Sequence, residues 1–142
     1  QKKVHLLGFR KNPFQLIANS IALIFASEQE GFGNVIVEGL ACSTPVLAAD
    51  IDNGPREILA PKTPEAFRTL EPEFAEYGVL LPTFHKEKNN QIIINQWVET
   101  IEETISKKEM LKQYSKNGIE RANAFDSKIL HPQFMNFINS IN

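Results

Sequence analysis

The sequence predicts an α/β fold in three layers, in which a parallel sheet has helices on both faces. Short apolar, β-branched runs alternate with amphipathic segments up to about residue 83, which is typical of parallel strands joined by crossover helices. Two of these runs, residues 21–26 and 45–49, are apolar throughout, as expected for strands that are buried on both faces. Beyond residue 83 the spacing of apolar residues becomes helical.

The elements expected before residue 83 alternate in the order strand, helix, strand. The strands are residues 4–7, 21–26, 45–49 and 78–81, and the helices are residues 14–19, 34–42 and 55–59. A helical region of about 89–142 follows, and we expect its terminal helices to cover the sheet. Trp97 lies on the apolar stripe of the first of these helices, which predicts a core position rather than a surface for stacking a sugar. Asp126 and Ser127 are the expected cap of the last helix.

Residues 60–76 do not follow this alternation. Three prolines interrupt them and four glutamates make them acidic, so we expect a surface insertion with one short helix over about 65–70. A solvated loop is the interpretation favoured over a functional lid.

Composition limits the classes of function. The 142 residues suit a single domain, 1–142, and their apolar share of 42% with 23% charged residues is that of a soluble globular chain. A net charge of −2 argues against nucleic acid as a partner. The single cysteine, Cys42, and the scattered histidines predict a reducing cytoplasm and no metal site, and no apolar run is long enough to cross a bilayer.

A glycine-rich turn after the second expected strand carries the chemistry. Residues 27–38 lead from that strand into a helix, and Gly31 and Gly33 allow a ligand to approach the main chain closely. Ligands of open parallel sheets bind beyond the carboxyl ends of the strands, and the free amides of a helix start attract anions. The turn is therefore predicted to bind a phosphate or sugar hydroxyls.

Glu30 and Glu38 lie on either side of this turn. A carboxylate accepts two hydrogen bonds from a vicinal diol, which ribose and hexoses offer. The spacing of eight alone is uninformative, because Glu57 and Glu65 share it. Two simpler interpretations stay open, with Glu38 as a solvent-facing helical residue and Glu30 as a charge favoured by the helix dipole.

Residues 30–46, Glu-Gly-Phe-Gly-Asn-Val-Ile-Val-Glu-Gly-Leu-Ala-Cys-Ser-Thr-Pro-Val, resemble the signature of retaining glycosyltransferases of family 4, the group 1 transferases with the GT-B fold. Residues 4–9 resemble the strand and glycine turn near the nucleotide base in that family, and residues 53–59 resemble its loop after the next strand. The resemblance covers nearly the whole chain, with 60–76 the least familiar part. It implies a Rossmann-like, C-terminal donor-binding half of a GT-B enzyme.

The resemblance also implies roles for single residues. Glu38 would hold the ribose hydroxyls of the donor nucleotide, and Glu30 would contact the donor sugar near the reacting centre. The remaining donor-binding residues act chiefly through the main chain; those at the sugar and phosphate are Phe32, Gly33, Asn34 and Val35, and those near the base are Phe9 and Arg10.

The implied reaction transfers a sugar from a nucleotide-diphosphate sugar to an acceptor hydroxyl, with retention and without metal or cofactor. A UDP-sugar and bacterial surface polysaccharide or lipopolysaccharide synthesis are favoured, in the cytoplasm; association with the inner face of the cell membrane stays open. Because the family's basic phosphate ligands and acceptor-binding domain lie upstream of Gln1, we expect this chain alone to bind nucleotide weakly and to transfer nothing. The alternatives are a non-catalytic nucleotide-sugar-binding module and a GT-B nucleotide-sugar epimerase. A hydrolase with an acid/base pair is disfavoured.

Arg56 follows the third expected strand, in the loop of residues 53–59. Its side chain could reach a phosphate. The favoured interpretation is an exposed or locally paired arginine, because Glu57 is adjacent.

Overall fold

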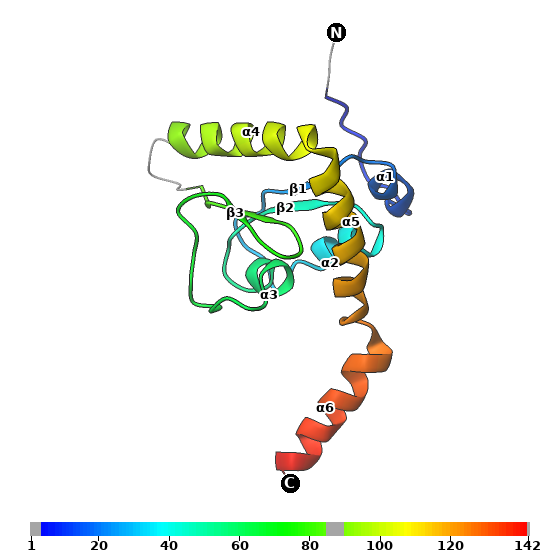
Figure 1. Ribbon diagram of the computed structural model, residues 1–142. Helices are drawn as coiled ribbons and strands as arrows, with labels where there is room; N and C mark the ends of the chain where they lie inside the picture. Colours follow the sequence, from blue (N-terminus) through cyan, green and yellow to red (C-terminus); the bar gives the residue numbers. More distant parts are fainter. Residues whose placement is uncertain (1–3, 85–89, 142) are drawn as a thin grey trace.

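The computed structural model describes residues 4–84 and 90–141, which contain a four-stranded sheet in the order β1-β2-β4-β3. β1 (Leu23–Phe25) pairs in parallel with β2 (Val46–Ala49), which pairs in parallel with β4 (Val79–Leu81). β3 (Glu73–Phe74) adds to β4 in the antiparallel direction. The parallel-dominated sheet with its helices confirms the predicted fold class (Figure 1).

Helices connect and follow the strands as the sequence predicts. α1 (Phe14–Ala18) precedes β1, α2 (Asn34–Ala41) joins β1 to β2, and α3 (Pro55–Leu59) follows β2. The helical region consists of α4 (Gln91–Ser106), α5 (Lys108–Asn123) and α6 (Ser127–Ile141). The ends of the expected region, residues 89 and 142, lie outside the described residues.

The core lies between the sheet and the helices that cross over it. β2 and β4 are buried along their whole length, because helices and neighbouring strands exclude water from both faces. Ile36 and Leu40 of α2 are completely buried, and α5 packs along the same helix. Trp97 of α4 is buried as predicted, and its indole N–H donates to the carbonyl of Pro82 at 2.9 Å.

The prediction of a strand over residues 4–7 is wrong. The chain there has no regular secondary structure and stands away from the sheet (Figure 1). Its apolar side chains are exposed, Leu6 to 96%. An apolar run becomes a strand only where a neighbouring edge pairs with it and its side chains are buried, and residues 4–7 have neither contact.

The helix predicted over 65–70 is also absent. Residues 60–72 run as turns and extended chain, and β3 ends the segment by turning back on β4, where Ala75 N donates to the Gly78 carbonyl at 2.9 Å. Prolines at 61, 64 and 72 interrupt helical hydrogen bonding. The segment is nevertheless fixed to the body by ionic contacts, which are described below.

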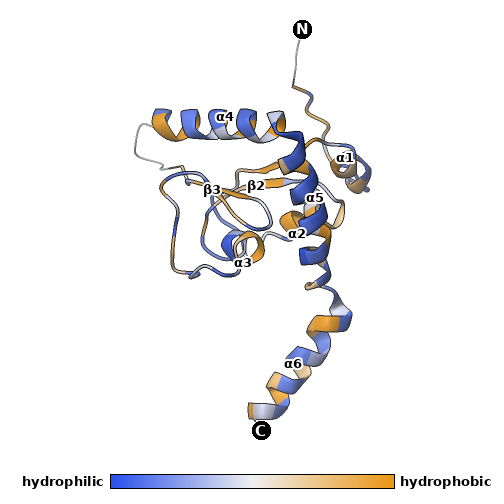
Figure 2. Cartoon of the chain, in the orientation of Figure 1, coloured by the Kyte–Doolittle hydropathy of each residue, from blue (hydrophilic) through white to orange (hydrophobic). Residues whose placement is uncertain are grey.

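α6 does not cover the sheet, contrary to expectation. It extends from the end of α5 away from the body of the molecule (Figure 1), and none of its residues is buried. Coloured by hydropathy, it shows apolar and polar patches alternating along its length (Figure 2). Asp126 caps its start, since its Oδ1 accepts a hydrogen bond from Lys128 N at 2.8 Å, as the sequence predicts.

Candidate functional site

The loops that follow β1 and β2 meet at the carboxyl edge of the sheet. Because the two strands are parallel neighbours, the loops that follow them leave the sheet at the same edge. Gly54, at φ +101°, lies so close to the first loop that a Cβ at this position would come within 1.7 Å of the Phe32 carbonyl oxygen. Only glycine fits here, so the missing side chain lets the two loops approach each other this closely.

The start of α2 lies within this junction. Gly33 adopts the left-handed conformation, with φ 81° and ψ 49°, and no side chain caps the helix. Its carbonyl accepts from Ile36 N at 2.9 Å, and the preceding amides of the first turn point along the helix axis. This backbone provides hydrogen-bond donors and the positive end of the helix dipole for an anion.

A first cavity, of about 540 Å³, opens beside this junction. We call it the polar cavity. Its lining includes Glu28 and Glu30 after β1, Asp52 and Asn53 after β2, and Arg68. Ser27 Oγ donates to Glu30 Oε1 at 2.9 Å, which holds this carboxylate at the rim of the cavity.

A second cavity of similar volume, about 540 Å³, lies along α2. We call it the aromatic cavity; its lining residues are Phe32, Asn34, Val37, Glu38, Glu57, Phe125 and Leu130. Phe32 and Phe125 form an edge-to-face pair with ring centroids 5.6 Å apart, and the Arg121 guanidinium lies 4.6 Å from the Phe125 ring. Glu38 is half-buried in this wall.

A third cavity, of about 570 Å³, shares residues with both of the others. It has Phe32 and Glu57 in common with the aromatic cavity, and Asp52, Asn53 and Arg68 in common with the polar cavity. We call it the middle cavity. The turn that follows Ala49 therefore borders two cavities at once.

The predicted site residues are thus divided. Glu30 lines the polar cavity and Glu38 the aromatic cavity, so the two carboxylates share no cavity. Phe32 and Asn34 line the aromatic cavity, Gly33 is buried at the helix start, and Val35 packs partly into the core. Phe9 and Arg10 are exposed and lie outside all three cavities.

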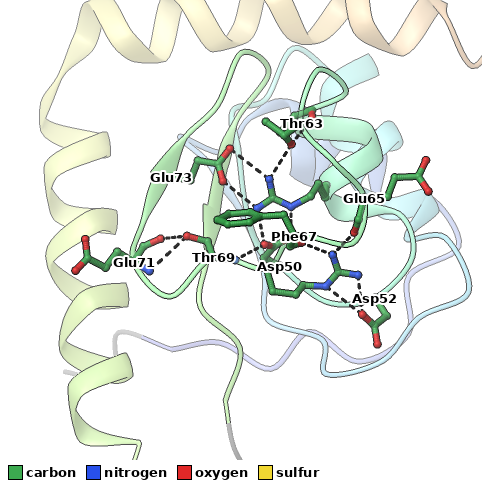
Figure 3. A network of polar contacts seen from close by, with 11 residues as sticks. Asp50, Asp52, Thr63, Glu65, Phe67, Thr69, Glu71 and Glu73 are labelled. Atoms are coloured by element: carbon green, nitrogen blue, oxygen red, sulfur yellow. Dashed lines mark hydrogen bonds and ion pairs between the residues drawn. The ribbon is translucent and has the colours of Figure 1, made fainter.

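An ionic network that the sequence does not reveal borders the polar and middle cavities (Figure 3). Arg56 is only 2% exposed. Its Nη2 lies 2.5 Å from Asp50 Oδ2 and 2.9 Å from Glu73 Oε2, while Nη1 donates to Thr63 Oγ1 at 2.8 Å. Of the two alternatives that the sequence favours for Arg56, exposed or locally paired, the structure shows a paired arginine that is buried, with Asp50 and Glu73 as its partners.

Arg56 carries its positive charge in the folded protein. Burial acts to lower the pKa of Arg56, but its hydrogen bonds and ion pairs with Asp50 and Glu73 outweigh burial and raise the pKa above its ordinary value. Asp50 also accepts a hydrogen bond from Thr69 N at 2.7 Å. The buried charges are therefore paired and hydrogen-bonded, as buried charges must be.

Residues 60–76 supply a second arginine to this edge. Arg68 Nη2 lies 2.6 Å from Asp52 Oδ1, and its Nη1 donates to the carbonyls of Glu65 and Phe67. Arg68, Phe125 and Leu130 line these cavities without being singled out in the sequence. The apolar spacing of the terminal helices gives their periodicity, but it does not show which of their residues reach the start of α2.

Two further findings concern metals and membranes. Within residues 4–84 and 90–141, no three His, Cys, Asp or Glu side chains gather into a metal-binding group. None of the helices in the same ranges is long and apolar enough to cross a membrane.

The fold is Rossmann-like, because adjacent parallel strands end in loops at the glycine-led start of α2. Residues 1–68 match the family model described as glycosyl transferases group 1. The chain is 34% identical over 134 residues to an uncharacterized glycosyltransferase of Methanocaldococcus jannaschii, covering 89% of this chain and 33% of the relative. These similarities support a glycosyltransferase.

Two further proteins are similar to the chain. It is 32% identical over 126 residues to the Campylobacter jejuni N-acetylgalactosamine-N,N'-diacetylbacillosaminyl-diphospho-undecaprenol 4-alpha-N-acetylgalactosaminyltransferase, covering 89% of this chain and 29% of the relative. The solved structure of sucrose-phosphate synthase from Thermosynechococcus elongatus superposes with a TM-score of 0.65 at 22% identity, covering 89% of this chain and 26% of that one. The latter likeness supports the GT-B fold. The chain spans a third or less of the length of these proteins.

Proposed function

We propose that this chain is the donor-binding domain of a retaining glycosyltransferase of family 4, which moves a sugar from a nucleotide-diphosphate sugar to an acceptor hydroxyl. One observation carries the proposal: the uncapped, glycine-led start of α2 lies between a cavity with Glu30 and a cavity with Glu38. An anionic diphosphate at the helix start would leave one of its two ends in each cavity.

The aromatic cavity suits the nucleoside. The Glu38 carboxylate can accept charge-assisted hydrogen bonds from both ribose hydroxyls, and its partial burial reduces their screening by water. The main-chain amides of residues 32–35 would bind the distal phosphate and sugar hydroxyls. Phe9 and Arg10 line none of the three cavities, so the base would have to extend beyond the aromatic cavity to make the main-chain contact that the resemblance implies.

The polar cavity suits the sugar. Glu30 would contact the donor sugar near the reacting centre, held by its hydrogen bond from Ser27. As the glycosidic bond breaks, negative charge develops on the leaving diphosphate, and fixed amide donors aimed at that charge lower the barrier without a metal ion.

The acceptor and the pathway are inferred from the relatives alone. The name of the Campylobacter relative gives a diphospho-undecaprenol-linked acceptor, which supports a role in bacterial surface polysaccharide or lipopolysaccharide synthesis. We propose that a UDP-sugar is the donor, that the acceptor-binding domain lies elsewhere in the same protein, and that the enzyme works in the cytoplasm, at the inner face of the membrane.

The test is a transfer assay on the full-length protein with UDP- and GDP-sugars, followed by NMR analysis of the anomeric configuration of the product. We expect transfer from a UDP-sugar with retention. Glu30→Gln should lower kcat at least about tenfold, because it removes a charge that acts at the reacting centre. Glu99→Gln, at an exposed position of α4 that lines none of the three cavities, is the matched control and should leave kcat nearly unchanged. An inverted product, or no binding of any nucleoside diphosphate, would refute the proposal.

A further inference from the structure

Arg56 links three segments of the chain through its side chain. It lies on α3, and its guanidinium binds Asp50 at the carboxyl end of β2 and Glu73 on β3. A planar guanidinium presents its donors in a fixed fork, so that both carboxylates are held at defined positions (Figure 3). The Phe67 ring, 4.9 Å from the Arg56 guanidinium carbon, packs against it from residues 60–76.

The ion pair between Asp50 and Arg56 closes the turn of residues 51–54. Asp52 and Asn53 of this turn line the polar and middle cavities, and Gly54 abuts the Phe32 carbonyl. Asn53 has a φ of 61°, which a residue other than glycine adopts at some cost. The Asp50–Arg56 ion pair joins the two ends of this backbone and is one of the contacts that hold it in this conformation.

Stability alone does not account for such a network. Replacing a buried ion network with apolar residues of similar volume is often neutral or stabilising, so the network is weak evidence for a stabilising role. What it specifies is one geometry for the chain segments that it joins. Here those segments are the turn 51–54 and residues 60–73, which carry Arg68 to the polar cavity.

We propose that Arg56 is a positioning residue for donor binding: with Asp50 and Glu73 it fixes the turn 51–54 and residues 60–73 against the start of α2. This inference rests on the proposed function. Glu73 gives a separate test of this role, because it lines none of the three cavities and its carboxylate forms an ion pair with Arg56.

The experiment compares Arg56→Lys and Glu73→Gln with wild type in the full-length protein. Lysine keeps the positive charge but lacks the fork, and glutamine keeps the shape of Glu73 but lacks its charge. We expect the Kd for UDP, measured by calorimetry, to rise about tenfold in Arg56→Lys and by a smaller factor in Glu73→Gln. Amide hydrogen exchange should accelerate in residues 51–54 and 60–73 of both variants.

The control is Ile17→Ala. Ile17 is buried at the opposite edge of the sheet, where its carbonyl accepts from Thr44 Oγ1 just before β2 begins. Assays at a temperature well below the Tm of every variant separate loss of stability from loss of binding. Ile17→Ala should lower the Tm and leave the Kd for UDP within about twofold of wild type.

The outcomes are separable. An unchanged Kd in both network variants, beside normal binding by wild type, overturns the positioning role and leaves the proposed function standing. A weaker Kd in Arg56→Lys alone, without faster exchange in 51–54, means that Arg56 contacts the donor directly, which also overturns it. If wild type binds neither UDP nor GDP, the proposed function fails and the inference fails with it.

Discussion

The polar cavity and the aromatic cavity, which lie on either side of the turn that contains Phe32, are built from different interactions. On the side of the polar cavity, ion pairs such as Arg56 with Asp50 and Arg68 with Asp52 join the loops. On the side of the aromatic cavity, α2 packs against α5, and Phe32 before α2 forms a ring contact with Phe125 after α5. Ion pairs specify geometry, whereas apolar contacts shield charge from water. Glu30 and Glu38 therefore lie in surroundings that favour different parts of a ligand, although they flank the same turn in the sequence.

The largest effect is expected where the two sides touch. Gly54→Ala would bring a Cβ into the Phe32 carbonyl oxygen and force alanine into a positive φ. We expect a loss of about 5 kcal/mol or more in the free energy of unfolding, measured by urea denaturation. Gly31→Ala is the matched control, because nothing lies within 4 Å of its added Cβ. Equal stability of the two variants would show that the loops do not meet.

The ionic side is tested by removing Arg56. Arg56→Ala leaves the buried Asp50 carboxylate without its counter-ion, which costs roughly 3 to 5 kcal/mol of unfolding free energy. Arg68→Ala removes an arginine whose partner Asp52 has a side chain 87% exposed, and should cost at most about 1 kcal/mol. Chemical denaturation of both variants measures the two losses in unfolding free energy. Similar losses would mean that burial does not distinguish the two pairs.

The aromatic side is tested through Glu38. Because its carboxylate would hold the ribose hydroxyls, Glu38→Ala in the full-length protein should weaken UDP binding by about 1.5 to 3 kcal/mol. Calorimetric titration measures the change. Glu109→Ala, on the exposed first turn of α5, is the control and should bind UDP as wild type does. If the two variants bind equally well, the ribose assignment to Glu38 is wrong.

The smallest effect concerns Tyr114, which is buried on α5. Burial raises the pKa of Tyr114 from 10.0 to about 12, since the phenolate is poorly solvated there. The folded protein keeps a proton that the unfolded chain releases, so stability falls as pH rises from about 10 toward 12.

Tyr114→Phe should match wild type at pH 7 within about 0.5 kcal/mol and lose less stability above pH 10. Denaturation curves across this pH range measure the difference. If α5 did not pack against the body, both proteins would show the same alkaline dependence.

The sequence predicts much of the fold because each buried element has a recognisable pattern of apolar residues. The continuous apolar runs at β2 and β4 and the four-residue spacing around Trp97 each reflect one element meeting the core. The same holds for the start of α2, where glycines and a following apolar face mark a strand-to-helix turn. The predictions fail where the pattern does not show whether a segment has a partner. Residues 4–7 are as apolar as a typical strand, but no neighbouring strand pairs with them.

Gly118 shows how a local reading can be incomplete. Asn117 and Gly118 weaken the middle of α5 by propensity, yet the helix runs through them. A Cβ at Gly118 would lie 3.0 Å from Leu40 Cδ2. The glycine therefore allows α5 to approach α2 closely, and the packing gained there outweighs its low helix propensity.

The sequence alone predicts the succession β1, α2, β2, α3 and β4, the glycine-rich turn and the two flanking glutamates, because each depends on residues within a few positions of one another. Only the tertiary structure decided that Glu30 and Glu38 face separate cavities, that Arg56 is buried between Asp50 and Glu73, and that Phe125 walls the cavity of Glu38. These pairs of residues lie 6 to 87 positions apart in the sequence. Their partners are set by how the elements pack, which no local pattern encodes.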